Sequence, residues 1–220
     1  MNLGNKKIIL VDGFKIRNTL DDDFGVFHQR ETEISNFAPK FYIQEDEVWV
    51  DNRFKDECDY LLKVYNFIKP TRGQTYEQMR ELAKEKFCAK GSVPEFVNRS
   101  EDVDGINVKY VNGAIVRRHI DPEFIFGGHE FVYSYIPENE IWLDEKMDPR
   151  EIPYILLHEK IERELMKNGK SYDVAHEYAT VADKEMRRRD GVGSYPGDMN
   201  YAWSGMSNQE IIQKEYVIKG

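Results

Sequence analysis

The sequence has few cysteines and no long hydrophobic run. Its two cysteines, Cys58 and Cys88, are too few and too far apart for a disulfide framework or a cysteine-rich zinc site. The longest apolar runs, such as residues 8–11 and 154–157, are far shorter than the roughly 20 residues that span a bilayer. The N-terminus also lacks the apolar stretch of a secretory signal. These absences predict a cytoplasmic protein without a membrane partner, in the host cytoplasm if the gene is viral.

Positive charge is also scarce. The 220 residues include 31 Lys and Arg against 40 Asp and Glu, which gives a net charge of −9. Because an acidic surface repels phosphate backbones, non-specific binding to nucleic acid is disfavoured, and the sequence carries no strong nucleic-acid signal. The hydrophobic content of 40% is ordinary for a folded chain. The expected ligand class, from the site hypotheses given below, is a peptide or protein, as a substrate or as a binding partner, and the oligomeric state is left open.

The chain contains an internal repeat. Four segments recur in the same order, the second of them with its tryptophan: 11–17 at 111–117, 47–51 at 140–144, 60–62 at 154–156 and 73–76 at 169–172. Chance is a poor account of four ordered matches, so the sequence predicts two copies of one unit. The predicted divisions are a first copy at 6–88, a linker at 89–105, a second copy at 106–190 and a C-terminal tail at 191–220.

Each copy predicts an α+β unit. A first strand runs into Asp12-Gly13 or Asn112-Gly113, which is a strong hairpin signal, and a later strand carries the tryptophan. Residues 131–135 are rich in aromatic and β-branched side chains and predict a further strand. Two helices follow. The expected fold is two tandem copies of a small antiparallel sheet with a helix pair packed on it.

The first helix of the second copy is predicted over residues 153–167, and it carries polar groups on its apolar face. At about 100° per residue, His158 and Glu162 fall in the middle of the apolar stripe, one turn apart. A buried carboxylate needs a partner or must become protonated. A His and a Glu four residues apart can give two ligands to one metal ion. The alternative is a hydrogen-bonded His–Glu pair without metal.

The second helix is predicted over residues 172–189, and the short connection makes the two helices antiparallel neighbours. His176 lies on its apolar face, and Asp183 lies two turns further along. We expect His158, Glu162 and His176 to converge on one divalent metal ion. Asp183 is either a fourth ligand or a residue that orients a ligand histidine. The first copy has Val64 and Arg80 where the second has His158 and His176, so it is expected to be a scaffold or an interaction surface.

The ligand set favours zinc (Zn²⁺), because two His and one Glu form a known catalytic zinc site; manganese (Mn²⁺) or iron (Fe²⁺) would suit the carboxylate equally. Glu159 follows His158 directly, as the general base does in H-E-x-x-H metalloproteases. Residues 127–129 predict a tight turn before a strand, or a loop that places His129 over the metal. In the second case His129 or Tyr133 would stabilise a developing oxyanion.

The motifs in residues 140–144, 157–166 and 172–177, with Gly127-Gly128-His129-Glu130 and residues 133–137 before them, resemble an uncharacterised family of bacteria and their phages. The resemblance covers most of the second copy and implies a zincin-like H-E-x-x-E…A-H helix pair. The family has no assigned activity, and Glu162 departs from the second His of H-E-x-x-H.

Two functions follow as expectations. The first is a metal-dependent, metallopeptidase-like hydrolase. The second is a non-catalytic binding protein, such as a phage inhibitor of a host protein, in which the His–Glu cluster only staples two helices. They differ at the fourth coordination position, which a catalytic ion keeps open and a structural ion fills with protein.

Overall fold

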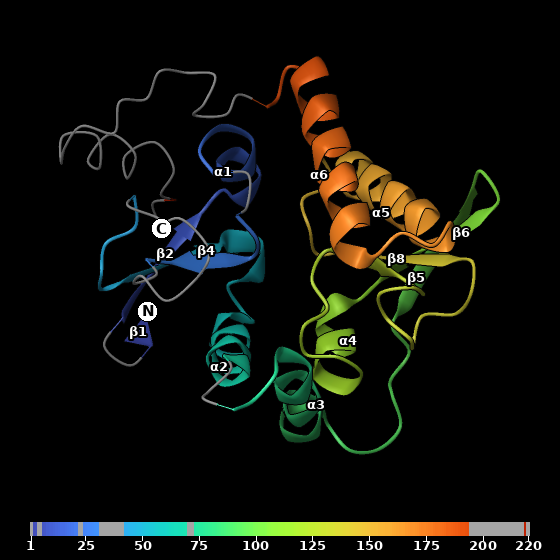
Figure 1. Cartoon of the computed structure of the whole chain (residues 1–220). Helices are drawn as coiled ribbons and strands as arrows, with labels where there is room; N and C mark the ends of the chain where they lie inside the picture. The colour runs from blue at the N-terminus through green and yellow to red at the C-terminus, as the bar shows by residue number, and fades with distance from the viewer. Residues whose placement is uncertain are drawn as a thin grey trace. The chain divides into compact units, whose positions relative to one another are not determined.

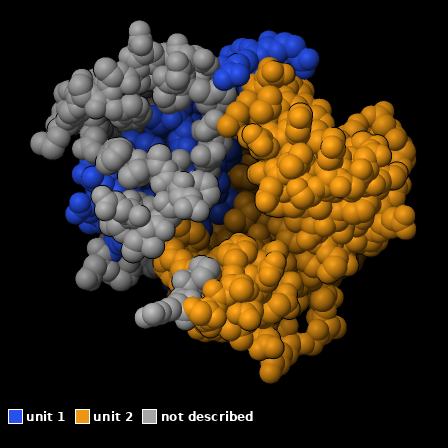
Figure 2. Space-filling model, in the orientation of Figure 1, with its two compact units in different colours: residues 1–59, 187–220 blue, residues 60–186 orange. Residues whose placement is uncertain are grey.

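The structure is a computed structural model that describes residues 2–3, 6–21, 24–30, 42–69, 73–193 and 218. The chain divides into two compact units, residues 1–59 with 187–220 and residues 60–186, which Figure 2 colours separately. The helix pair of the first repeat copy therefore falls almost wholly within the second unit. Most of the predicted C-terminal tail, residues 191–220, lies outside the described residues.

Each unit contains one four-stranded sheet, and the two sheets have the same topology. The first has the order β1-β2-β4-β3 and the second has the order β5-β6-β8-β7. The strands are β1 (Asn2–Leu3), β2 (Lys6–Val11), β3 (Phe27–Gln29), β4 (Glu47–Asp51), β5 (Val97–Val103), β6 (Ile106–Val111), β7 (Gly127–His129) and β8 (Glu140–Asp144). The α+β class and the two sheet–helix units are thus confirmed. The central pairs β2·β4 and β6·β8 are parallel, so the sheets are mixed and not antiparallel as predicted.

The predicted hairpins are wrong, and their turn residues have another role. Gly13 and Gly113 begin the short helices α1 (Gly13–Thr19) and α4 (Gly113–His119). The side chains of Asp12 and Asn112 cap these helices by accepting hydrogen bonds from the third backbone N–H beyond them. Because a helix and not a tight turn follows the first strand, the chain crosses over and the next strand in the sheet centre runs parallel.

Two further expectations also differ from the structure. Residues 97–103, inside the predicted linker, form β5, which pairs antiparallel with β6. Asp104 and Gly105 make the tight turn between them, both with positive φ. Residues 131–135 form turns and not a strand. The rings of Tyr133 and Tyr135 instead pack against Phe124 and Trp142, which accounts for much of the aromatic enrichment that suggested a strand.

The longer helices come in two consecutive pairs: α2 (Cys58–Ile68), preceded by a 3-10 turn at Asn52–Phe54, with α3 (Tyr76–Phe87), and α5 (Ile152–Lys167) with α6 (Tyr172–Arg189). The predicted helices at 153–167 and 172–189 agree with α5 and α6 to within one residue. In Figure 1, α5 and α6 lie beside each other next to β8. α5 packs on β7 and β8, so one face of the second sheet carries the helix that bears the predicted ligands.

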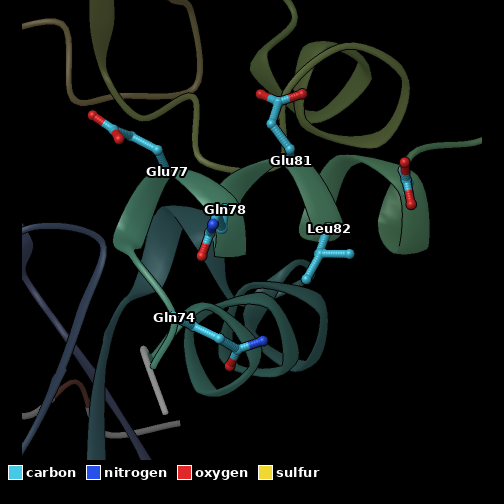
Figure 3. Close-up of a pocket in the computed structure, with 6 residues that line it drawn as sticks. Gln74, Glu77, Gln78, Glu81 and Leu82 are labelled. Carbon is cyan, nitrogen blue, oxygen red and sulfur yellow. The ribbon is translucent and has the colours of Figure 1, made fainter. Parts of the chain in front are cut away.

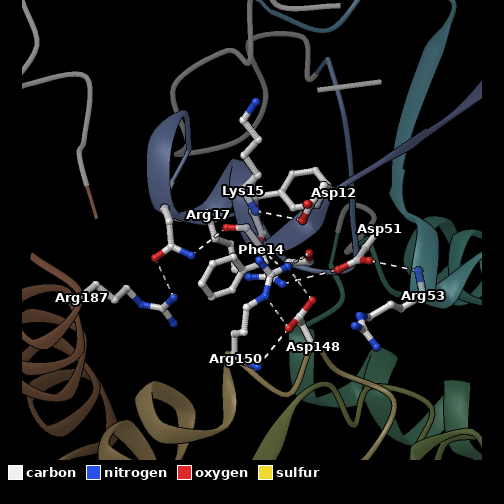
Figure 4. Close-up of polar contacts among 12 residues, drawn as sticks. Asp12, Phe14, Lys15, Arg17, Asp51, Arg53, Asp148, Arg150 and Arg187 are labelled. Carbon is white, nitrogen blue, oxygen red and sulfur yellow. Dashed lines mark hydrogen bonds and ion pairs between the residues drawn. The ribbon is translucent and has the colours of Figure 1, made fainter. Parts of the chain in front are cut away.

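An arginine–aspartate ion pair recurs in both copies and ties each short helix to its tryptophan strand. Arg117 Nη1 lies 2.7 Å from Asp144 Oδ2, and neither side chain is exposed. The equivalent Arg17 and Asp51 are 3.4 Å apart, and Figure 4 shows that pair. Asp144 also accepts a hydrogen bond from the backbone N–H of Gly113, where any Cβ would collide with the carboxylate. Glycine is therefore required at that position.

We expect Asp144→Ala to lower the free energy of unfolding by about 3–5 kcal/mol, because it leaves the Arg117 guanidinium buried without its anion. Urea denaturation followed by tryptophan fluorescence measures this change. Glu145→Ala, at the exposed neighbouring position, is the control and should stay within about 0.5 kcal/mol of the wild type. Equal effects of the two substitutions would contradict a structural role for the ion pair.

Candidate metal site

The antiparallel pair α5 and α6 brings three predicted ligands to one point. Gly169 adopts φ of 83°, the left-handed conformation that ends a helix and lets the chain reverse. His158 Nε2 lies 3.2 Å from His176 Nδ1, and Glu162 Oε2 lies 2.7 Å from His176 Nδ1 and 3.5 Å from His158 Nε2. Two ring nitrogens and one carboxylate oxygen therefore face a common space.

This triangle has the dimensions of a zinc site. With metal–ligand bonds of about 2.0–2.1 Å and tetrahedral angles, neighbouring ligand atoms lie about 3.3 Å apart. The three observed separations lie on both sides of that value. A small movement of His176 would therefore bring the three ligand atoms to the spacing of a zinc site. His176 is the side chain best able to shift, because 48% of it is exposed, against 12% of His158 and 4% of Glu162.

Asp183 does not join this triangle. Its Oδ2 lies 3.1 Å from Nδ1 of His158, the ring nitrogen that points away from the other ligands. A proton on Nδ1 donated to Asp183 leaves Nε2 with its lone pair free to bind a metal, the arrangement by which carboxylates orient ligand histidines. Of the two roles considered for Asp183, the geometry fits orientation and not ligation. The described residues then supply three ligand atoms and no fourth.

His129 lies behind the candidate ligands and not over them. It ends β7, is fully buried, and its Nε2 lies 3.2 Å from Oε1 of Glu162. The backbone N–H of Phe131 donates to Nδ1, so the neutral ring carries its proton on Nε2 and donates it to Glu162. Neither a tight turn nor a loop forms at this point. His129 holds the ligand carboxylate and is not placed to stabilise an oxyanion.

His129, Glu159 and Glu162 form a second group of possible ligand atoms. The hydrogen bond from Phe131 argues against metal on His129 Nε2, because that nitrogen is the protonated one. Glu162 thus presents one oxygen to His129 and the other to His158 and His176. A carboxylate held from behind by a histidine keeps its second oxygen aimed at the space between the two helices.

Glu159 is buried beside this group, as its place in the motif predicts. It is 9% exposed, and its Oε1 lies so near Gly127 that a Cβ there would approach to 3.1 Å. Burial and the negative charge of Glu162 raise the pKa of Glu159, the positive charge of His158 lowers it, and the balance is about 7. A carboxyl with that pKa can take up and release a proton near neutral pH.

The cluster also shifts the pKa values of its two central groups. Burial would lower the pKa of His158, but hydrogen bonds to Asp183 and Glu162 outweigh burial and raise it to about 10. For Glu162, burial acts to raise the pKa, yet the hydrogen bonds from His129, His158 and His176 hold it well below its usual range. Without metal, His158 is therefore protonated and Glu162 is ionised at neutral pH.

Tyr133 lines a cavity of about 300 Å³ next to the cluster. Burial raises the pKa of Tyr133, and the charges of Asp121 and Glu159 raise it further, so the hydroxyl keeps its proton. Its ring packs between Phe124 and Tyr135, and it closes over Gly128, where a Cβ would collide with it. Tyr133 is therefore a fixed hydroxyl donor in the wall beside Glu159.

A second hollow, of about 520 Å³, lies on α3 and is shown in Figure 3. It is lined by Gln74, Glu77, Gln78, Glu81, Leu82 and Glu85. No histidine or cysteine lines it, and Lys84 already pairs with Glu81. It is an exposed acidic helix face, so the candidate chemistry of the described residues is concentrated at α5 and α6.

Comparisons with protein-family models, with curated proteins and with solved structures found no match to this chain. The family resemblance stated above therefore stays an expectation. None of the described helices is both long and apolar enough to cross a membrane.

Sequence reasoning missed the aromatic surroundings of the cluster. The ring of Tyr172 stacks on His176 with centroids 5.3 Å apart, and Phe131 lies 6.1 Å from His129. The repeat held one signal for them, since Tyr172 recurs as Tyr76, and Tyr76 lines the same cavity. No local sequence pattern indicates the contact between His129 and Glu162, because 33 residues separate them.

In metal-free protein, the ionised cluster predicts a stability that depends on pH. The folded pKa of His158, about 10, exceeds its unfolded value near 6.5, so its contribution is complete below about pH 6.5 and is lost as pH rises through 10. We expect the difference in unfolding free energy between wild type and Asp183→Asn to shrink from pH 6 to pH 10 in EDTA. Urea denaturation at each pH measures it.

Asp173→Asn, at an exposed acid in the first turn of the same helix, is the matched control. Its difference from the wild type should stay nearly constant over this pH range. A constant difference for Asp183→Asn as well would mean that Asp183 does not hold the proton on His158.

Proposed function

We propose that this chain is a metal-dependent hydrolase that cleaves peptide bonds, with zinc as the first candidate metal and manganese or iron as alternatives. The metal would be held by His158 Nε2, His176 Nδ1 and Glu162. The observation that carries the proposal is the triangle of ligand atoms with no fourth protein ligand among the described residues. An incomplete coordination shell is the feature that separates catalytic from structural zinc sites.

A bound ion would supply Lewis-acid polarisation of the scissile carbonyl and of the attacking water. The chain's own groups carry the protons. Glu159 would accept a proton from the water that adds to the carbonyl carbon, and would return it to the amine that leaves when the C–N bond breaks. Tyr133, a protonated hydroxyl, is available to donate a hydrogen bond to the oxyanion. His129 and Asp183 act through the ligands, by orienting Glu162 and His158 respectively.

The first repeat copy supports a functional reading of the cluster. From the repeat alignment, Val64 stands where His158 stands, and Ile68 stands where Glu162 stands. Both are buried and pack with Met79 and Ala83 in an apolar cluster between α2 and α3. The same helix pair can thus be held together by apolar contacts alone. Since buried polar groups are costly, their presence between α5 and α6 favours a role beyond folding.

One observation favours the second candidate, a binding protein with a structural staple. The polar groups already satisfy one another without metal, since Glu162 accepts from His129 and His176 while Asp183 accepts from His158. Such a network can rigidify a helix pair. In that case a protein partner, such as a host protein bound by a phage product, would replace the peptide substrate.

His158→Val, which installs the residue of the first copy, separates these two candidates. For the hydrolase we expect about one zinc, manganese or iron per wild-type chain and none in the variant. The metal-free variant should be less stable under either candidate, because Glu162 and Asp183 lose the partner that His158 provides, so the metal content decides between them. Elemental analysis and urea denaturation in EDTA measure the two quantities. No metal in either protein, with a variant that is clearly less stable, would favour the staple.

Glu159→Gln tests the catalytic role. Loss of the general base should lower the rate of peptide hydrolysis by about 10²–10⁴-fold while metal content is retained. Glu164→Gln, at an exposed position of the same helix, is the control and should keep full activity. Equal rates for Glu159→Gln and wild type would remove Glu159 from the mechanism.

A further inference from the structure

The cavity beside the candidate metal site is built from both repeat copies. Tyr172 begins α6, Met166 lies near the end of α5, and Tyr76 with Arg80 comes from α3. All of them belong to the compact unit of residues 60–186. Because Tyr172 stacks on His176, the wall of the cavity is one side chain away from a candidate ligand. A group bound in the cavity would therefore lie next to the reacting bond.

The repeat brings equivalent residues to this cavity from two helices. Tyr76 of α3 stands where Tyr172 stands in α6, and Arg80 stands where His176 stands. The second copy supplies a histidine at that place and the first supplies an arginine, yet both tyrosines line one cavity. This arrangement gives the first copy's helix a part in the site, as a wall of the cavity.

The charged groups in the cavity wall are neutralised by one another. Arg80 Nε lies 2.8 Å from Glu123 Oε2, and Arg80 Nη2 lies 3.4 Å from Asp121 Oδ2. Tyr76 donates its hydroxyl proton to Glu123. A cationic ligand would meet the guanidinium of Arg80, and an anionic ligand would meet Glu123, the other charged residue of the lining. Neither sign of charge is therefore favoured.

The remaining lining is apolar and mostly aromatic. Tyr76, Phe131 and Tyr172 line the cavity and are 51%, 42% and 45% exposed, while Tyr133 is half-buried. Exposed aromatic rings grouped around a cavity are typical of binding sites. The volume of about 300 Å³ is at the lower end of ligand sites, which suits one side chain and not an extended ligand.

We propose that this cavity binds an apolar, preferentially aromatic, side chain of a peptide, at a residue that flanks the bond to be cleaved. That the bound peptide is cleaved rests on the proposed hydrolase function, but its binding in the cavity does not require the metal. Aromatic rings of the peptide would pack against the rings of Phe131 and Tyr172 in offset or edge-to-face contacts.

The test measures Kd by calorimetry for four blocked tripeptides, acetyl-Ala-X-Ala-amide with X as Phe, Ala, Lys or Asp, against the full chain in EDTA. We expect the Phe peptide to bind at least about tenfold more tightly than the other three. Phe131→Ala, which removes an exposed ring from the lining, and Met166→Trp, which fills the cavity, should each raise its Kd about tenfold. Tyr178→Ala is the matched control, because Tyr178 is a 63% exposed aromatic residue that does not line the cavity.

The outcomes separate the cavity from the metal site. Equal Kd values for the Phe and Ala peptides, or no effect of Phe131→Ala, would overturn the proposal even if the chain binds zinc. Tightest binding of the Lys peptide would overturn it in favour of a cation site. A preference for Phe that is lost in Phe131→Ala but not in Tyr178→Ala supports it, and would do so even if elemental analysis found no metal and the hydrolase proposal failed.

Discussion

The second sheet–helix unit depends on one buried carboxylate. Glu162 lies in the apolar face of α5, where an unpaired negative charge would be costly. Three histidines from three elements offset that cost: His129 from β7, His158 from α5 itself and His176 from α6. The same contacts connect α5 to the sheet behind it and to the helix beside it. The contacts that pair the charge of Glu162 are therefore the same contacts that assemble the candidate site.

The two repeat copies solve the same packing problem in different ways. Between α2 and α3, Val64 and Ile68 meet Met79 and Ala83, and the contact is apolar. Between α5 and α6, the equivalent positions are polar and ionised, while Ala175 and Ala179 keep the helices close. The buried Arg–Asp pair is common to both copies. What is shared therefore belongs to the fold, and what differs belongs to the site.

The elements that could be predicted are those with the strongest local sequence patterns. α5 and α6 follow from the 3.6-residue spacing of their apolar residues and from Gly169 between them. The tryptophan strands β4 and β8 follow from short runs of β-branched and apolar residues. The Asp-Gly and Asn-Gly pairs misled, because the same side chains that favour hairpin turns also cap helices. Because these residues begin helices and not turns, the central strand pairs β2·β4 and β6·β8 run parallel and not antiparallel as expected.

The sequence by itself determined that His158 and Glu162 share a helix face and that His176 lies on the facing helix, because helical spacing and a short connection are local properties. Tertiary structure alone decided which ring nitrogen each acid meets. It placed Asp183 on Nδ1 of His158 and His129 behind Glu162, since these contacts depend on rotamers and on packing between distant segments. The aromatic cavity is also a tertiary feature, because the segments that line it are separated along the chain and meet only when the unit is folded.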